Sequence, residues 1–203
     1  MDPVFDTRMM ARALKLARRG QYSAMPKPHV GCVLVRAGRI IGEGYTQPAG
    51  GNHAEIEALQ AAQDASGAVA YVTLEPCSHQ GKTGPCADAL IAAGVTRVVA
   101  ATLDPNPRVA GQGLEKLRAA GMEVEHGLLE DEARQLIPGF ISRMTRGRGR
   151  VRAKLAMSLD GRTAMASGES QWITGPAARE DVQRLRAMSC AVLTGIGTVL
   201  SDD

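Results

Sequence analysis

The apolar residues of this chain recur first at helical spacing and then in short runs typical of strands. A first helix is predicted over residues 4–19, and Gly20 ends it. Its apolar residues, separated by basic ones, are Phe5, Met9, Ala13, Leu14 and Ala17. Residues 30–36 and 39–44 are runs of strand length joined at Ala37-Gly38, which predicts a β-hairpin.

Helical and strand-like segments then alternate up to residue 145. Helices are predicted over residues 53–65, 85–93, 111–120 and 130–144, and strands over 69–74, 95–102 and 122–127. Strands that alternate with helices form a largely parallel sheet covered on both faces. We therefore predict an α/β fold of three α/β/α layers for residues 1–145, with the opening helix and hairpin adding an antiparallel edge.

The composition changes near residue 145. Residues 143–154 contain five arginines and one lysine without a helical period, which predicts a solvated linker at 146–150; a nucleic-acid-binding patch is the alternative. Beyond it we expect a strand at 151–157, a turn at 158–161, a helix at 176–188, a strand at 191–194 and a strand-to-helix loop at 195–198. These elements are too few to close a sheet, so residues 151–203 are predicted to be an incomplete second unit.

The overall composition narrows the class of protein. Hydrophobic residues make up 44% of 203 residues, but only two are Phe, three Tyr and one Trp, so the predicted core is aliphatic. A net charge of +3 permits a phosphate-bearing small molecule and gives no reason to expect nucleic acid. No signal-peptide pattern precedes the four cysteines, and no apolar run is long enough to span a membrane. We therefore expect reduced thiols and a cytoplasmic location.

One histidine, one glutamate and two cysteines carry the strongest functional signal. His53 and Glu55 stand two positions apart, and Cys77 and Cys86 follow in a Pro-Cys-x8-Cys pattern. One imidazole and two thiolates are the ligand set of a catalytic zinc site that leaves a fourth position for water; a purely structural zinc site is the alternative. Glu55 stands within reach of that water and can move its proton. The pattern predicts a deaminase that adds water to an amidine carbon and releases ammonia.

Two neighbouring loops are candidates for substrate binding. Gly81-Lys82-Thr83 lies between the cysteines, but Pro76 replaces the first glycine of a nucleotide P-loop, so a P-loop is rejected. Lys82 is a candidate phosphate contact, with a solvated lysine as the alternative. Asp104 and Asn106 follow a predicted strand at the edge where sites on parallel sheets collect, with an ordinary turn as the alternative.

Longer motifs extend the pattern over nearly the whole chain. They are Thr73-Leu-Glu-Pro-Cys-Ser-His-x-Gly-Lys-Thr, Asp104-Pro-Asn-Pro-x-Val-Ala-Gly-x-Gly, Lys154-Leu-x-x-Ser-Leu-Asp-Gly-Arg-Thr-Ala and Ser167-Gly-Glu-Ser-Gln-Trp-Ile-Thr. The chain resembles the bifunctional riboflavin-biosynthesis deaminase/reductase family. The resemblance implies a cytidine-deaminase-like domain that deaminates 2,5-diamino-6-(5-phosphoribosylamino)pyrimidin-4(3H)-one. It also implies a following dihydrofolate-reductase-like domain that reduces the ribosyl group with NADPH, and association into homo-oligomers.

The resemblance assigns roles to individual residues. His53, Cys77 and Cys86 would bind one Zn²⁺, and Glu55 would be the proton shuttle. The deaminase substrate would contact Lys82, Thr83, Asp104 and Asn106. NADPH would contact Ala156, Trp172, Thr198 and Asp202, and the reductase substrate Ser170 and Arg186; a core position is the alternative for Trp172. The cofactor's phosphate-binding segment would lie beyond Asp203, so we expect no reductase activity from this chain alone.

Three positions depart from the family pattern. Lys27 replaces the asparagine of Asn-Pro-x-Val-Gly, Thr46 replaces a histidine seven residues before His53, and Gly84 replaces the first of two prolines before Cys86. Lysine cannot accept a hydrogen bond, so a changed substrate or lowered activity is one competing hypothesis. A second is a deaminase acting on another base, such as adenosine in tRNA or a free nucleoside. A third is a catalytically silent zinc-binding scaffold.

Overall fold

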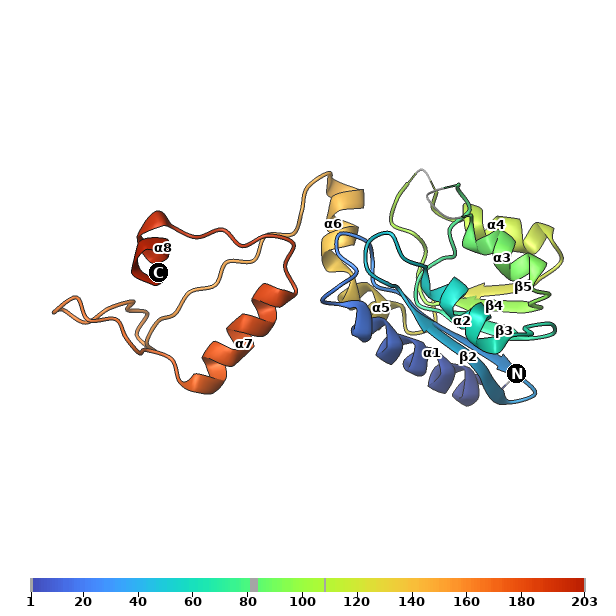
Figure 1. The fold of residues 1–203 in the computed structure, drawn as a ribbon, viewed down its shortest axis with the longest axis horizontal. Helices are drawn as coiled ribbons and strands as arrows, with labels where there is room; N and C mark the ends of the chain where they lie inside the picture. Colours follow the sequence, from blue (N-terminus) through green and yellow to red (C-terminus); the bar gives the residue numbers. More distant parts are fainter. Residues whose placement is uncertain (1, 81–83, 108, 203) are drawn as a thin grey trace. The chain divides into compact units, whose positions relative to one another are not determined.

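A computed structural model describes residues 2–80, 84–107 and 109–202, which divide into two compact units, Met1–Arg150 and Val151–Asp203. The first unit contains a five-stranded sheet with helices on both faces (Figure 1). The described part of the second unit contains two helices, α7 (Pro176–Ala187) and α8 (Ile196–Asp202). None of the helices among these described residues is long and apolar enough to cross a membrane.

The sheet has the strand order β2-β1-β3-β4-β5. The strands are β1 (Gly31–Arg36), β2 (Arg39–Tyr45), β3 (Val69–Val72), β4 (Arg97–Ala100) and β5 (Glu123–His126). The predicted hairpin is confirmed, and β3, β4 and β5 are parallel. The crossover from β2 through the helix α2 (Ala54–Ala62) leads to the far side of β1, so β1 pairs antiparallel with both of its neighbours. The sheet is therefore mixed, with more antiparallel pairing than the sequence pattern predicted.

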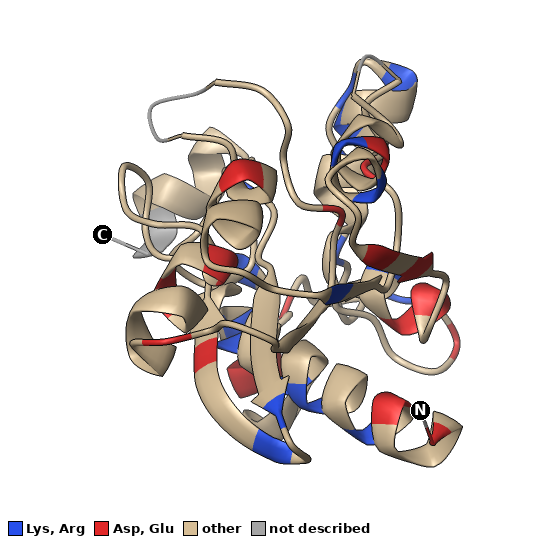
Figure 2. Ribbon diagram, turned by 90° about the vertical axis from the view of Figure 1, so that its right-hand side faces the viewer, with Lys and Arg blue, Asp and Glu red and all other residues tan. Residues whose placement is uncertain are grey.

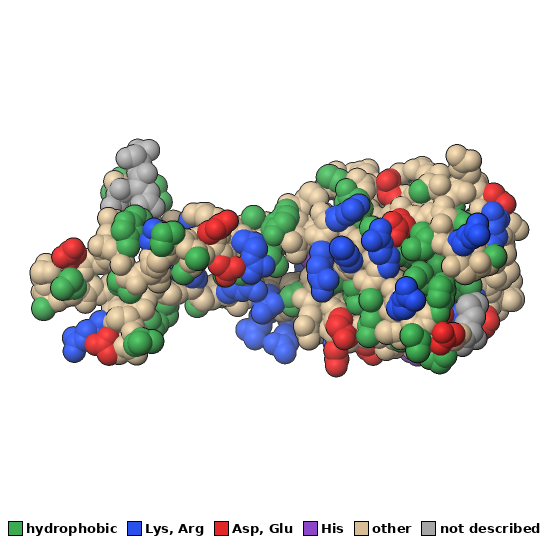
Figure 3. Space-filling view, turned by 90° about the horizontal axis from the view of Figure 1, so that it is seen from below, with side chains coloured by type: hydrophobic (Ala, Val, Ile, Leu, Met, Phe, Trp, Pro, Cys, Tyr) green, Lys and Arg blue, Asp and Glu red, His purple; other side chains and the backbone are tan. Residues whose placement is uncertain are grey.

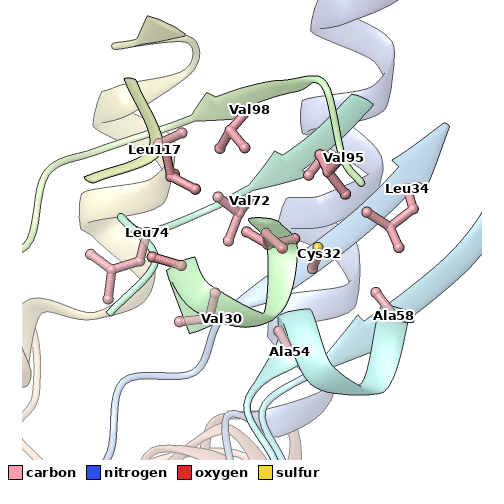
Figure 4. Packing of buried hydrophobic residues seen from close by; sticks show 14 of the residues in the cluster. Val30, Cys32, Leu34, Ala54, Ala58, Val72, Leu74, Val95, Val98 and Leu117 are labelled. Carbon is pink, nitrogen blue, oxygen red and sulfur yellow. The ribbon is translucent and has the colours of Figure 1, made fainter. Parts of the chain in front are cut away.

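Two aliphatic clusters fill the space between the sheet and its helices. Side chains alternate between the two faces of a strand, so Val98 of β4 joins one cluster and Val99 the other. Figure 4 shows Val98 beside Leu117 and Val72 on the face covered by α2, α3 (Cys86–Ala92) and α4 (Gln112–Ala119). The opposite cluster includes residues of α1 (Pro3–Ala17) and α5 (Glu130–Leu136). The predicted three layers and aliphatic core are confirmed.

The helix expected at residues 130–144 is two helices. α5 ends at Leu136, and α6 (Pro138–Arg146) begins two positions later, after Ile137. Proline has no N–H to donate to the preceding turn and disfavours helical geometry in the residue before it. Ile137 accordingly has φ −119° and ψ 40°, and Pro138 takes the first position of the new helix, where its missing N–H costs nothing. The described part of the first unit also contains the short 3-10 helix η1 (Arg18–Gly20), which follows α1.

The second unit has fewer regular elements than the sequence predicted. The helix α7 is confirmed, but residues 151–157 and 191–194 form no strands, and α8 begins at Ile196, where a loop was expected. A strand requires a hydrogen-bonded neighbour, and the described residues of this unit contain none. Large apolar side chains such as Leu155 and Leu193 are 69% and 100% exposed, and no hydrophobic residue in the described part of this unit is buried.

Candidate active site

The residues predicted as metal ligands converge from three separate segments. His53 immediately precedes α2, Cys77 follows the extension of β3, and Cys86 is the first residue of α3. The Nδ1 atom of His53 lies 3.3 Å from Sγ of Cys86 and 3.7 Å from Sγ of Cys77. One ligand atom from each residue lies within 4.8 Å of the others, which is close enough for a single ion to bind all three.

Close backbone packing holds these segments in place. A methyl group on Gly44 of β2 would lie 2.1 Å from the carbonyl oxygen of Ala54, so only glycine lets the first turn of α2 approach the sheet so closely. On the other side, the Cys86 N–H donates to Sγ of Cys77 at 3.3 Å, and the Ala87 N–H donates to the Cys77 carbonyl at 3.1 Å. The first turn of α3 therefore fixes the position of Cys77.

The donor set fits Zn²⁺. Hydrogen bonds from the Cys86 thiol and from His53 lower the pKa of Cys77 to about 4, whereas the contact with Cys77 and burial raise the pKa of Cys86. The protein alone thus favours one thiolate and one thiol at this site. A divalent cation favours the deprotonated form of every ligand, and two sulfur atoms with one imidazole nitrogen are a common zinc-binding set.

Glu55 lies beside the three ligands in the first turn of α2. It is 4% exposed and hydrogen-bonds with the Cys86 thiol. Burial raises the pKa of the Glu55 carboxyl to about 7, and the nearby Cys77 thiolate adds to the shift. A carboxyl with such a pKa exchanges protons readily near neutral pH, as a general acid–base residue must.

The loop after β4 carries two of the predicted substrate residues. Asp104 is half-buried and accepts a hydrogen bond from the Asn106 N–H at 2.8 Å, which makes a local turn. Burial raises the pKa of Asp104. The Asp104 N–H donates to the carboxylate of Glu75 at 3.0 Å, and Glu75 stands two positions before Cys77, so the loop lies near the metal ligands. Lys82 and Thr83, also predicted to contact the substrate, lie outside the described residues.

Glu75 is a residue of this site that the sequence analysis missed. It is 5% exposed and lies two positions before Cys77, and its carboxylate binds backbone N–H groups on the loop after β4 and in α4. The available signal was a charged residue at the end of a buried apolar strand. Such a side chain requires partners, because an isolated buried carboxylate is costly.

Two of the residues that depart from the family pattern, Lys27 and Thr46, contact backbone atoms near His53. Lys27 is half-buried, and its Nζ donates to the carbonyl oxygens of Pro48 at 3.4 Å and Gly51 at 3.2 Å. Thr46 is 3% exposed, and its Oγ1 accepts a hydrogen bond from the Val30 N–H at 2.9 Å. Both side chains therefore brace the backbone that leads to the candidate ligand His53.

The candidate reductase residues all lie in the second unit. Trp172 is 71% exposed, with the Arg179 guanidinium 4.3 Å from the centre of its ring, so it is not a core residue of this unit. Arg186 hydrogen-bonds to Gln183 in the same helix. Ala156 is half-buried, and Ser170 and Thr198 are exposed. Asp202 belongs to α8, but its side chain lies outside the described part.

The fold and the histidine–cysteine–cysteine group define the class of cytidine-deaminase-like zinc proteins. Residues 3–102 match the family model of the cytidine and deoxycytidylate deaminase zinc-binding region. Residues 150–203 match the model of the RibD C-terminal domain. The riboflavin biosynthesis protein RibD of Escherichia coli is 62% identical over 199 residues, which are 98% of this chain and 54% of that protein.

Two solved structures are similar over both units. Acinetobacter baumannii RibD is 56% identical with a TM-score of 0.93, over 99% of this chain and 57% of that one. The second is a Thermotoga maritima diaminohydroxyphosphoribosylaminopyrimidine deaminase/5-amino-6-(5-phosphoribosylamino)uracil reductase. It is 45% identical with a TM-score of 0.92, over 98% of this chain and 58% of that one. The chain belongs to the RibD family and spans about half the length of the curated relatives it matches.

Proposed function

We propose that this chain performs the hydrolytic, zinc-dependent deamination of 2,5-diamino-6-(5-phosphoribosylamino)pyrimidin-4(3H)-one in riboflavin biosynthesis. The observation that carries this proposal is the convergence of His53, Cys77 and Cys86 within 4.8 Å, beside the buried carboxyl of Glu55. The Thermotoga maritima relative is described as a deaminase and reductase of this kind.

In the proposed reaction, His53, Cys77 and Cys86 hold the metal and Glu55 moves the protons. Bound zinc would supply water that ionises near neutral pH. Glu55 would take one proton from water as the water oxygen bonds to C2 of the ring, and would pass this proton to a ring nitrogen. Glu55 would then take the second proton from the hydroxyl group now on C2 and deliver it to the amino group, so that the bond between C2 and the amino nitrogen breaks, ammonia leaves and a carbonyl remains. The pKa of about 7 for Glu55 supports both directions of transfer.

Four residues are proposed to bind the substrate. Asp104 and Asn106 would contact a polar edge of the pyrimidine ring from the loop after β4. The hydrogen bond from the Asp104 N–H to Glu75, two positions before Cys77, supports this assignment. Lys82 and Thr83 would contact the phosphate side, a proposal that rests on the motif between the two cysteines.

The contacts of Lys27 and Thr46 bear on the competing hypotheses. Both side chains bind backbone carbonyl or N–H groups near the site, which is a role compatible with the usual substrate. These contacts therefore give no support to the hypothesis that Lys27 and Thr46 change the substrate. The silent-scaffold hypothesis is disfavoured by Glu55, because a buried carboxyl beside three metal ligands is a cost without benefit in a purely structural site.

The second unit is proposed to be part of a reductase domain. We propose a deaminase domain at residues 1–145, a linker at 146–150 and the amino-terminal part of an NADPH-dependent domain at 151–203. Its exposed apolar side chains, such as Leu155 and Leu193, support the view that more chain must cover them before NADPH binds. Ala156, Trp172, Thr198, Asp202, Ser170 and Arg186 would then take their ligand-binding roles.

A small-molecule substrate is also favoured by the charge distribution. Up to residue 142, basic and acidic residues are interspersed along the elements (Figure 2), and acidic and apolar side chains lie among the basic ones on the first unit (Figure 3). Residues 143–154, around the predicted linker, contain five arginines, one lysine and no acidic residue. Nucleic-acid sites are typically marked by a concentrated basic patch or stripe. No disulfide joins the four cysteines, all of them among the described residues, which supports the proposed reducing, cytoplasmic setting. Association into homo-oligomers stays a prediction.

The test is ammonia release from the diaminopyrimidinone ribosylamine phosphate by zinc-loaded protein. Glu55→Gln is expected to lower the rate about 10²–10⁴-fold while retaining zinc, because it removes the proton carrier and keeps the ligands. Glu57→Gln is the matched control: it lies in the same helix, and glutamine still accepts the hydrogen bond from Asn52. Release of ammonia from adenosine in tRNA, but not from the pyrimidine, would replace this proposal with a deaminase of another base. Zinc binding without activity toward either substrate would favour the silent scaffold.

A further inference from the structure

The carboxylate of Glu75 binds four backbone N–H groups from one loop and the helix that follows it. Its Oε2 accepts from Asp104 at 3.0 Å and from Gly111 at 2.9 Å. Its Oε1 accepts from Gly113 at 2.8 Å and from Leu114 at 3.4 Å. These donors stand at both ends of the loop and in the first turn of α4, so one side chain closes the loop at both of its ends.

The surrounding backbone holds Glu75 itself in place. Its N–H donates to the Thr102 carbonyl at 2.9 Å, which extends the pairing of β3 with the strand beside it. A methyl group on Gly113 would lie 2.0 Å from the carbonyl oxygen of Pro76, so α4 begins in direct contact with the segment that carries Glu75. The N–H groups of a first helical turn lack partners within the helix, and a carboxylate placed there satisfies them and complements the helix dipole.

The same short segment also carries a candidate metal ligand. Glu75 is two residues before Cys77, and the loop that it closes contains Asp104 and Asn106. We propose that Glu75 is a positioning residue that fixes the two ends of the substrate-binding loop, at Asp104 and Gly111, relative to the metal site. This inference rests on the proposed deaminase function, because it assumes that the loop contacts the substrate. Glu75 acts through the loop backbone and does not touch the reacting atoms.

The test compares Glu75→Gln with the unmodified chain. The amide has nearly the shape of the carboxylate, but its NH₂ group cannot accept hydrogen bonds, so two of the four N–H groups lose their acceptor. The expected result is a KM for the pyrimidine phosphate raised about tenfold, with zinc content unchanged and a smaller effect on kcat, as for a loss of ground-state binding. Hydrogen exchange at the amides of Asp104, Gly111 and Gly113 is expected to accelerate.

Glu43→Gln is the matched control. It removes a partly buried carboxylate bonded to Arg12, away from the loop, and is expected to leave both KM and exchange at these amides unchanged. Gly111→Ala is a second variant in case Glu75→Gln folds poorly: Gly111 has φ +83°, so alanine strains the loop while the carboxylate stays. This variant is also expected to raise KM.

The outcomes separate this inference from the proposed function. If Glu75→Gln only reduced the fraction of folded protein, the maximal rate would fall and KM would stay unchanged. That result would overturn the positioning role. If the unmodified chain releases no ammonia, the proposed function fails, and hydrogen exchange then decides the inference. Unchanged protection of the Asp104 and Gly111 amides in Glu75→Gln overturns it, and loss of protection supports the closure of the loop by this side chain.

Discussion

Arg97 of β4 and Asp6 of α1 form an ion pair between two elements that are far apart in the sequence. Their Nη2 and Oδ2 atoms are 2.7 Å apart, and the side chains are only 5% and 10% exposed. Asp6 also accepts a hydrogen bond from the Tyr71 hydroxyl at 2.5 Å. The same Nη2 atom of Arg97 lies 2.6 Å from Oε1 of Glu125 in β5. The network fixes the first helix to three strands of the sheet.

Asp6→Asn is expected to lower the free energy of unfolding by about 3 kcal/mol, because it leaves a buried guanidinium without its most buried countercharge. Urea unfolding of the two proteins measures the difference. The control is Glu43→Gln, which breaks the more exposed pair with Arg12 and is expected to cost at most about 1 kcal/mol. Equal losses of unfolding free energy in the two variants would show that the buried network stabilises the fold no more than the exposed pair does.

Protonation of Asp6 should contribute to the pH dependence of the unfolding free energy. Burial alone would raise its pKa, but hydrogen bonds from Arg97 and Tyr71 outweigh burial and lower it below the ordinary value of 3.8. A lowered pKa stabilises the fold fully above 3.8, and this contribution is lost as the pH falls below 3.8 toward the folded-state pKa. Unfolding free energies measured from pH 6 to pH 2.5 should fall less steeply below pH 4 in Asp6→Asn than in the unmodified chain.

Removing one candidate ligand should abolish tight zinc binding. Cys77→Ala is expected to weaken zinc affinity more than about 100-fold, since even residues that merely support ligands change affinity 10–100-fold. The matched control is Cys190→Ala, because Cys190 is an exposed thiol in the second unit. Competition with a chromogenic chelator measures both affinities. Equal zinc affinity in the two variants would contradict the assignment of Cys77.

Restoring the family residues near His53 should not increase activity. In the double variant Lys27→Asn/Thr46→His, the bonds to Gly51 and Val30 are lost, and a large ring must fit at a position that is 3% exposed. We expect no gain in kcat/KM and a melting temperature lowered by several degrees, as for an overpacked core costing about 1–3 kcal/mol. A tenfold gain in deamination would instead support the hypothesis that these residues changed the substrate or lowered the activity.

Local patterns were sufficient to predict most elements of the first unit. Apolar spacing located α1, the hairpin and the alternating helices, because burial of one face imposes a period on neighbouring residues. The zinc-site pattern was equally readable, since ligand types and the spacing of His53 from Glu55 are properties of the chain itself. The break at Pro138 was also available in principle, because proline disfavours helix in the residue before it.

Contacts between distant segments required the tertiary structure. Residues 151–157 have the composition of a strand, but a strand forms only where another strand supplies its hydrogen bonds. The order of the sheet, with β1 antiparallel to both neighbours, depends on where the α2 crossover packs. The role of Glu75 depends on backbone N–H groups 29 and 38 positions away in sequence, at Asp104 and Gly113. Such contacts leave no periodic trace in the chain, because backbone donors are the same in every residue and only folding decides which of them meet a buried carboxylate.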